Sequence, residues 1–196
     1  MINQKPIIYF DMDGVLADMQ GMMDKYGIKY NSPTEHDPVV DQNMWDEVRK
    51  IDHFYDKLKP VEGSVELFNN LSAKYECQIL TAIPKEKWNI PDAKEDKINW
   101  AKRYLGDDVK INTVYRPEKK DFVKGSQSIL VDDLPQNIKE WEAEGGTGIL
   151  FIDSKSFNYD KLNKTILDFR MSLLGKDSKN EDNIEKGDAV YDQISC

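Results

Sequence analysis

The chain has 196 residues and a net charge of −9 at pH 7, so it is long enough for one domain with a small insertion and lacks the basic balance of proteins that bind long nucleic acid. No run approaches the ~20 apolar residues that a membrane-spanning helix needs, and the N-terminal segment lacks the basic start and long apolar stretch of a secretory signal. These features predict a cytoplasmic protein whose partners include neither a membrane nor a long nucleic acid.

The first predicted strand covers residues 7–10, an apolar run that ends at the carboxylate-rich turn Asp11-Met12-Asp13-Gly14. The segment 18–59 follows a different pattern, because Met and aromatic residues stand among charges there and prolines interrupt it. We interpret this segment as a helical cap inserted after the first strand. A pair of ordinary packing helices is the alternative interpretation.

The later predicted strands share one pattern, an apolar run followed at once by a polar residue. They are residues 76–80 before Thr81, residues 128–131 before Asp132 and Asp133, and residues 148–152 before Asp153. Helical patterns at 96–105 and 135–144 lie between them. Strands that alternate with helices predict right-handed crossovers and a mostly parallel α/β sheet flanked by helices.

The domain prediction follows from this pattern. Residues 1–17 and 60–175 are assigned to the α/β core, and residues 18–59 to the cap. The polar tail 176–196 is expected to be disordered or loosely attached.

Cysteine and histidine are too sparse for a thiolate or imidazole metal centre. Cys77 and Cys196 lie far apart, and His36 and His53 are expected to be surface or packing residues. We predict no disulfide and no zinc site, so any bound metal should be held by oxygen.

Polar residues that end parallel strands meet at one edge of the sheet, so Asp11, Asp13, Thr81, Asp132 and Asp133 are expected to face one crevice. Asp11 and Asp13 alone could belong to a surface turn. Carboxylates packed together raise one another's pKa unless a cation is present, and Mg²⁺ suits such a site because it prefers oxygen ligands. One Asp could then attack phosphorus while another protonates the leaving oxygen and later activates water.

Four segments resemble, in chain order, the four motifs of the haloacid dehalogenase-like (HAD) phosphatase superfamily. They are Phe10 to Val15, Leu80-Thr81-Ala82, the loop 116–120 with its lysines, and Val131-Asp132-Asp133. The resemblance implies a Rossmann-like HAD fold and a Mg²⁺-dependent phosphomonoester hydrolase that forms an aspartyl-phosphate.

The resemblance also implies roles for the matching residues. Asp11 would be the nucleophile and a metal ligand, and Asp13 the general acid/base and a ligand through its backbone carbonyl. Asp133 would bind the metal directly with Asp132 in support, and Thr81 would bind the phosphate. A lysine of the third motif would neutralise the phosphate, and of Lys119 and Lys120 we prefer Lys120.

Within the superfamily, the chain resembles the 5′(3′)-deoxyribonucleotidase family through the extended first motif and through segments 54–63, 79–84 and 129–133. This implies a nucleoside monophosphate substrate whose base lies in an apolar or aromatic slot. Candidate substrate-binding residues are Met19, Trp45, Phe54, Tyr55, Thr81 and Ala82. Met19 stands where the family places an aromatic, and Ala82 where members often have Ser. Core packing is the alternative role for the cap residues.

Three other functions stay open. The chain could be a HAD phosphatase for a sugar phosphate or another small phosphomonoester, or a non-catalytic binding protein with the same fold. Its acidic balance disfavours an end-processing phosphatase that acts on polynucleotides. Whether the chain forms a homodimer is also left open.

Overall fold

The computed structural model describes residues 5–32 and 37–187, with side chains as far as residue 173. The chain divides after Asn158 into a compact unit and helix α6 (Tyr159–Gly187). Helix α6 is therefore described by itself, as 29 residues of helix. No helix in the described ranges is both long and apolar enough to cross a membrane.

The compact unit is built on a five-stranded, fully parallel sheet in the order β3-β2-β1-β4-β5. The strands are β1 (Ile7–Phe10), β2 (Glu76–Ala82), β3 (Ile111–Val114), β4 (Ser128–Asp132) and β5 (Thr147–Leu150). Strand β1 lies in the centre, with β2 and β4 as its neighbours, so the strands that carry the predicted motifs are adjacent. This arrangement confirms the predicted parallel α/β fold.

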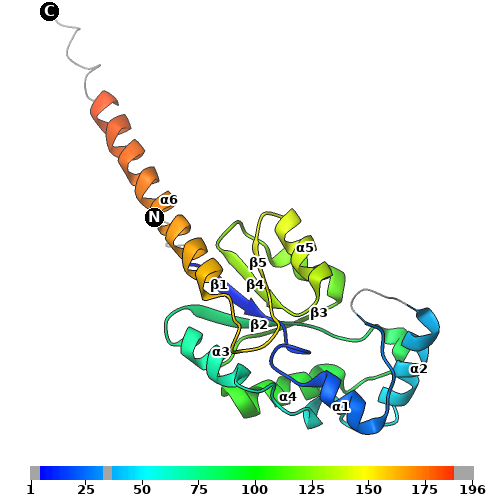
Figure 1. The fold of residues 1–196 in the computed structure, drawn as a ribbon. Helices are drawn as coiled ribbons and strands as arrows, with labels where there is room; N and C mark the ends of the chain where they lie inside the picture. The colour runs from blue at the N-terminus through cyan, green and yellow to red at the C-terminus, as the bar shows by residue number, and fades with distance from the viewer. Residues whose placement is uncertain (1–4, 33–36, 188–196) are drawn as a thin grey trace, which may run out of the picture. The chain divides into compact units, whose positions relative to one another are not determined.

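Helices cover both faces of this sheet. Helix α5 (Pro135–Ala143) lies on one face, and α3 (Ser64–Ser72) and α4 (Ala93–Leu105) lie on the other (Figure 1). Two buried indoles fix α5 and α4, because Trp141 Nε1 donates to the carbonyl of Ser128 over 3.0 Å and Trp100 Nε1 donates to the carbonyl of Leu58 over 2.8 Å. The central strands β1 and β4 are buried and carry mostly apolar residues, as strands of parallel sheets usually do.

The segment between β1 and α3 contains α1 (Met19–Tyr26), α2 (Pro38–Val48) and the short 3-10 helix η1 (Tyr55–Lys57). Asp18 caps α1 by accepting from the amide of Gly21, and Asp37 caps α2 by accepting from the amide of Val39. The predicted helical character of this segment thus has a local basis. Two further 3-10 helices are η2 (Glu86–Trp88) and η3 (Arg116–Phe122).

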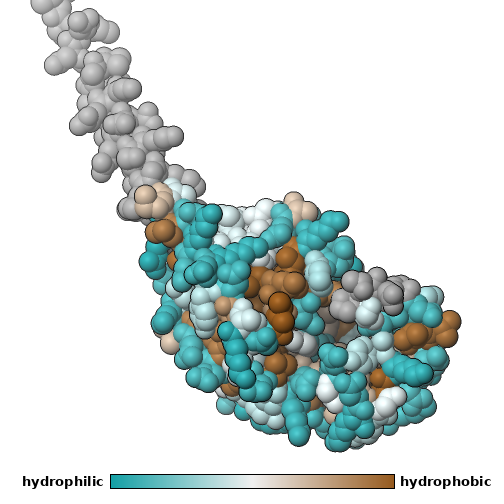
Figure 2. Space-filling model, viewed as in Figure 1, coloured by the Kyte–Doolittle hydropathy of each residue, from teal (hydrophilic) through white to brown (hydrophobic). Residues whose placement is uncertain are grey.

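Some elements differ from the sequence expectations. Strand β3 and helix α3 had not been predicted, and α6 continues through residues 175–187, which had been assigned largely to a tail. Residues 188–196, including Cys196, lie outside the described residues. The surface of the compact unit is largely hydrophilic in the view of Figure 2, in keeping with 32% charged residues.

Candidate active site

Asp11 lies directly after β1, at the carboxyl edge of the sheet. Its amide donates to the carbonyl of Val131 over 2.9 Å, which extends the pairing of β1 with β4 by one residue. Its Oδ1 accepts from the amide of Met12 over 2.7 Å. The chain then folds back, because the amides of Leu16 and Ala17 both donate to the carbonyl of Met12 over 2.8 Å. This turn holds the side chain of Asp11, a buried residue that is 7% exposed, in a fixed position.

Lys119, and not Lys120, reaches this carboxylate. Lys119 Nζ lies 2.8 Å from Asp11 Oδ2 and 2.8 Å from Asp132 Oδ2, and the residue is buried. Lys120 is exposed and pairs with Glu144 at 3.5 Å. The structure therefore brings Lys119, the other lysine of the third motif, to the predicted nucleophile, because the tight turns of η3 point the two neighbouring side chains in different directions.

Charge at Lys119 is stabilised by its two partners. Burial by itself lowers the pKa of the Lys119 ammonium, but the carboxylates of Asp11 and Asp132 outweigh burial and raise that pKa above its ordinary value. The site therefore favours the charged form of Lys119 next to the predicted nucleophile.

Asp132 is the fully buried last residue of β4, and its carboxylate is surrounded by donors. Besides Lys119, the amide of Leu134 and the side-chain amide of Asn137 donate to it, each over 2.9 Å. Arg116 in turn donates to Asn137 Oδ1 over 3.0 Å. Burial, and then the nearby Asp11 charge, raise the pKa of Asp132 to about 6. These contacts fix the Asp132 carboxylate beside Lys119.

Asp133 completes a group of three carboxylates with Asp11 and Asp132, and an oxygen from each lies within 4.8 Å of the other two. Asp133 as a whole is exposed, but its carboxylate is partly removed from water inside this group, and this desolvation, followed by the charges of Asp11 and Asp132, raises the pKa of Asp133 to about 8. Gly14 makes room for this group, because a Cβ on Gly14 would lie 2.1 Å from Asp133 Oδ2. Gly14 also has φ of +77°, a conformation that favours glycine.

Lys97 of α4 is a site residue that the sequence analysis missed. It is 0% exposed, and its Nζ donates to Asp13 Oδ2 over 2.5 Å and to Thr81 Oγ1 over 2.9 Å. Burial raises the pKa of Asp13, while the nearby Lys97 charge opposes the rise. The helical spacing could have indicated that Lys97 is buried. It stands three and four residues before the buried Trp100 and Ala101, on the apolar side of α4.

The predicted substrate-binding residues of the cap fall into two groups. Phe54 and Tyr55 are each 1% exposed and pack edge to face, with ring centroids 5.2 Å apart. Both side chains are thus packed inside the compact unit, in line with the core-packing role given as the alternative for the cap residues. Trp45 is partly exposed and stacks on Trp88 of η2 at 5.8 Å and 24°. Met19 is partly exposed at the first residue of α1. Ala82, a predicted substrate-binding residue outside the cap, is partly exposed at the last residue of β2.

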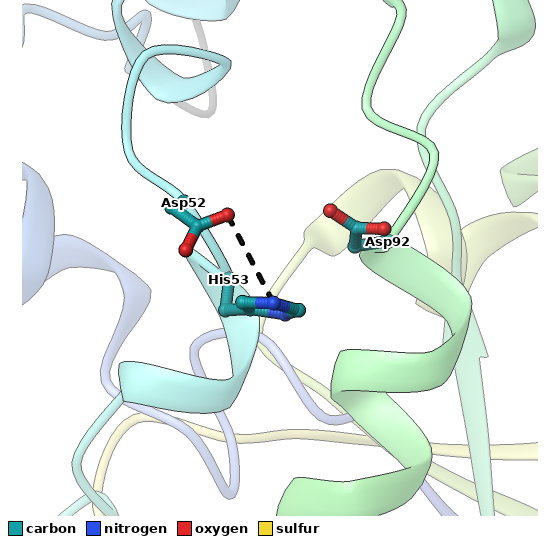
Figure 3. Close-up of side chains that lie close together, drawn as sticks. All are labelled: Asp52, His53 and Asp92. Carbon is teal, nitrogen blue, oxygen red and sulfur yellow. Dashed lines mark ion pairs between the residues drawn. The ribbon is translucent and has the colours of Figure 1, made fainter.

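A second group of potential metal ligands lies at the surface, where Asp52, His53 and Asp92 come together (Figure 3). All three are exposed, and His53 Nδ1 lies 2.8 Å from the buried Asp96. That hydrogen bond, and then the charge of Asp52, raise the pKa of His53. This group joins the segment after α2 to the start of α4, and we assign no ligand to it. His36 lies outside the described residues.

Two aspartate pairs, a threonine and a buried lysine at the carboxyl edge of a parallel sheet place the protein in the HAD class. Residues 5–164 match the family model described as 5′ nucleotidase, deoxy (Pyrimidine), cytosolic type C protein. The chain therefore belongs to this nucleotidase family, which confirms the resemblance drawn from the extended first motif and from segments 54–63, 79–84 and 129–133.

Individual relatives agree with this family. A protein of Vibrio phage KVP40, provisionally named a 5′(3′)-deoxyribonucleotidase, is 34% identical over 102 residues, which cover 52% of this chain and 52% of the relative. The chain thus matches about half the length of that relative. The 5′(3′)-deoxyribonucleotidase of Bacillus subtilis is 28% identical over 159 residues, covering 75% of this chain and 85% of the relative.

The chain is also similar to solved structures of low sequence identity. The L-2-haloacid dehalogenase of Xanthobacter autotrophicus superposes with a TM-score of 0.48 at 13% identity, covering 78% of this chain and 80% of that one. A HAD-superfamily hydrolase of Ehrlichia chaffeensis has a TM-score of 0.44 at 13% identity, covering 84% of this chain and 98% of that one.

Proposed function

We propose that the protein is a Mg²⁺-dependent 5′(3′)-deoxyribonucleotidase, a phosphatase that hydrolyses nucleoside monophosphates in the cytoplasm through an aspartyl-phosphate on Asp11. The observation that carries the proposal is the buried Lys119, which bridges Asp11 and Asp132 within a group of three carboxylates. The family match and the names of the relatives support the substrate class.

The reaction needs two steps. Asp11 attacks phosphorus, the bond to the ester oxygen breaks, and Asp13 gives its proton to the leaving nucleoside oxygen. Asp13 then takes a proton from water, which attacks phosphorus and releases phosphate and the free Asp11 carboxylate. Lys119 and Thr81 supply a positive charge and a hydroxyl donor for the phosphate oxygens.

The three carboxylates also fit a magnesium ion. Their oxygens lie within 4.8 Å of one another, and burial and mutual repulsion raise the pKa of Asp132 and Asp133, which a bound cation would relieve. Asp11 and Asp133 would hold the ion with the Asp13 backbone carbonyl, and Asp132 would support them. When bound, Mg²⁺ supplies charge neutralisation for the phosphate.

The Gly14→Ala variant tests this metal site. Its Cβ would meet Asp133 Oδ2 at 2.1 Å, so the Asp133 carboxylate must move. We expect the Mg²⁺ concentration for half-maximal activity to rise by about 10-fold or more, because displaced ligands weaken metal sites by that order. Gly27→Ala is the matched control, since Gly27 has φ of +65° and nothing within 4 Å of a Cβ. Equal Mg²⁺ dependence of the two variants would contradict the assignment.

A substrate panel tests the proposed function. Steady-state hydrolysis is measured on 5′- and 3′-deoxynucleotides, the matching ribonucleotides and a sugar phosphate, with and without Mg²⁺. We expect activity that needs Mg²⁺ and prefers deoxynucleotides. Equal rates on the sugar phosphate would favour a general small-molecule phosphatase, and no hydrolysis of any ester would favour a binding protein.

The cap contributes to the proposal through one pair of side chains. Trp45 lies on α2 and Trp88 in η2, which follows β2, and their stacked rings join the cap to the carboxyl edge of the sheet. A partly exposed aromatic pair on the cap would suit a nucleobase, because bases stack on indole rings. We accordingly keep residues 18–59 as a cap that helps to select the base, with Met19 and Trp45 as its candidate contacts. Whether two chains associate stays a separate question.

A further inference from the structure

Lys97 is completely buried, although the two reaction steps described above make no use of it. An ammonium that is removed from water loses much hydration free energy, so a buried lysine needs charged or polar partners that offset this cost. Lys97 has two such partners at hydrogen-bond distance, Asp13 Oδ2 at 2.5 Å and Thr81 Oγ1 at 2.9 Å. Both partners are residues to which the proposed reaction gives a task.

The ring of Tyr55 is the third group in contact with the Lys97 ammonium. Lys97 Nζ lies 4.5 Å from the centroid of the Tyr55 ring, a distance at which the ring face attracts a cation. Tyr55 itself is buried at the start of η1. The ammonium is thus fixed between a carboxylate, a hydroxyl and an aromatic ring, which come from three different parts of the chain.

Asp13 depends on this lysine for its orientation. Its Oδ1 is buried and has no hydrogen-bond partner within the described ranges, so the contact with Lys97 is the one that fixes the carboxylate. The Asp13 side chain still keeps 24% of its surface exposed, which leaves it open to a substrate. We infer that Lys97 is a positioning residue, which holds the Asp13 carboxylate where it can exchange a proton with the leaving oxygen. This inference rests on the proposed function.

The Lys97→Met variant tests the inference in the full chain with Mg²⁺. If Lys97 acts by positioning the general acid Asp13, its loss should slow the reaction most for substrates whose leaving oxygen needs a proton. The value of kcat/KM is therefore measured on a deoxynucleoside monophosphate, whose alkoxide leaving group needs one, and on p-nitrophenyl phosphate, whose phenolate leaves without one. We expect the loss on the deoxynucleotide to exceed the loss on the aryl ester by about 100-fold, the usual order for general acid catalysis.

The matched control is Lys94→Met, because Lys94 is an exposed lysine on the same helix. It should change both values by less than about twofold, as surface substitutions usually do. Circular dichroism checks that each variant is folded. If Lys97→Met is not folded, Lys97→Gln replaces it, and the same difference between the two substrates is expected.

Equal losses on the two substrates would overturn the inference, because a purely structural role of Lys97 would affect both reactions alike. Failure of the proposed function would look different. In that case the wild-type protein itself would hydrolyse neither substrate with Mg²⁺, or only the aryl ester.

Discussion

The Asp11→Asn variant is expected to lose hydrolysis of deoxynucleoside monophosphates by about 10⁴-fold or more, the order seen when a nucleophile is removed. The amide has nearly the shape of the carboxylate and can still accept from the Met12 amide, so the fold should be retained. It cannot attack phosphorus, however, because it lacks the negative charge. Steady-state rates with Mg²⁺ give the size of the loss.

Trapping of the phosphoenzyme tests whether the reaction passes through a covalent phosphate on Asp11. Wild-type protein that is mixed with phosphate-labelled substrate and quenched in acid should carry label, and Asp11→Asn should carry none. Asp107→Asn serves as the control, since Asp107 is exposed in the turn after α4. Full activity or full labelling of Asp11→Asn would show that another residue attacks phosphorus.

Lys119→Met should lower kcat/KM by about 100-fold or more, whereas Lys120→Met should change it by less than about twofold. The first substitution removes a buried charge that lies 2.8 Å from both Asp11 and Asp132. The second removes an exposed partner of Glu144 at 3.5 Å. The two variants make the same chemical change one residue apart, so each is the matched control of the other.

The free energy of unfolding should also differ between the Lys119→Met and Lys120→Met variants. Loss of Lys119 leaves two carboxylates facing each other, and breaking a buried ion pair on one side typically costs about 3–5 kcal/mol. Lys120 belongs to a surface pair, and such pairs contribute about 0–1 kcal/mol. Thermal unfolding of both variants is therefore measured together with their kcat/KM values. The assignment of Lys119 would be wrong if Lys120→Met showed the larger loss of activity.

The strands next to the site could be predicted because they are buried on both faces and therefore stand out as apolar runs. Residues 7–10 were predicted at their observed bounds, and residues 128–131 fell one residue short. Strand β3, with Asn and Thr in its four residues, lies at the edge of the sheet, and all four residues are partly exposed. An edge strand of this kind lacks the apolar run on which the prediction depended.

The site could be predicted where it depends on the ends of strands. Asp11, Asp132 and Asp133 come together because parallel strands bring their carboxyl ends to one edge. The direction of a side chain within η3 depends on local turns, so the sequence could not separate Lys119 from Lys120. Lys97 could not be recognised as a site residue from its neighbours in the sequence. Its partners Asp13 and Thr81 lie on other elements, 84 and 16 positions away in the chain.

The ion pair between Lys97 and Asp13 joins residues that are 84 positions apart in the chain. Contacts of such long range form only after the intervening chain has folded, because closing a long loop costs entropy before the contact repays it. During synthesis the carboxylates of the first turn emerge early, long before α4 and β4 exist to hold them. An unfinished chain should therefore be inactive toward nucleotides, and catalytic competence should appear only when the sheet closes around its central strand.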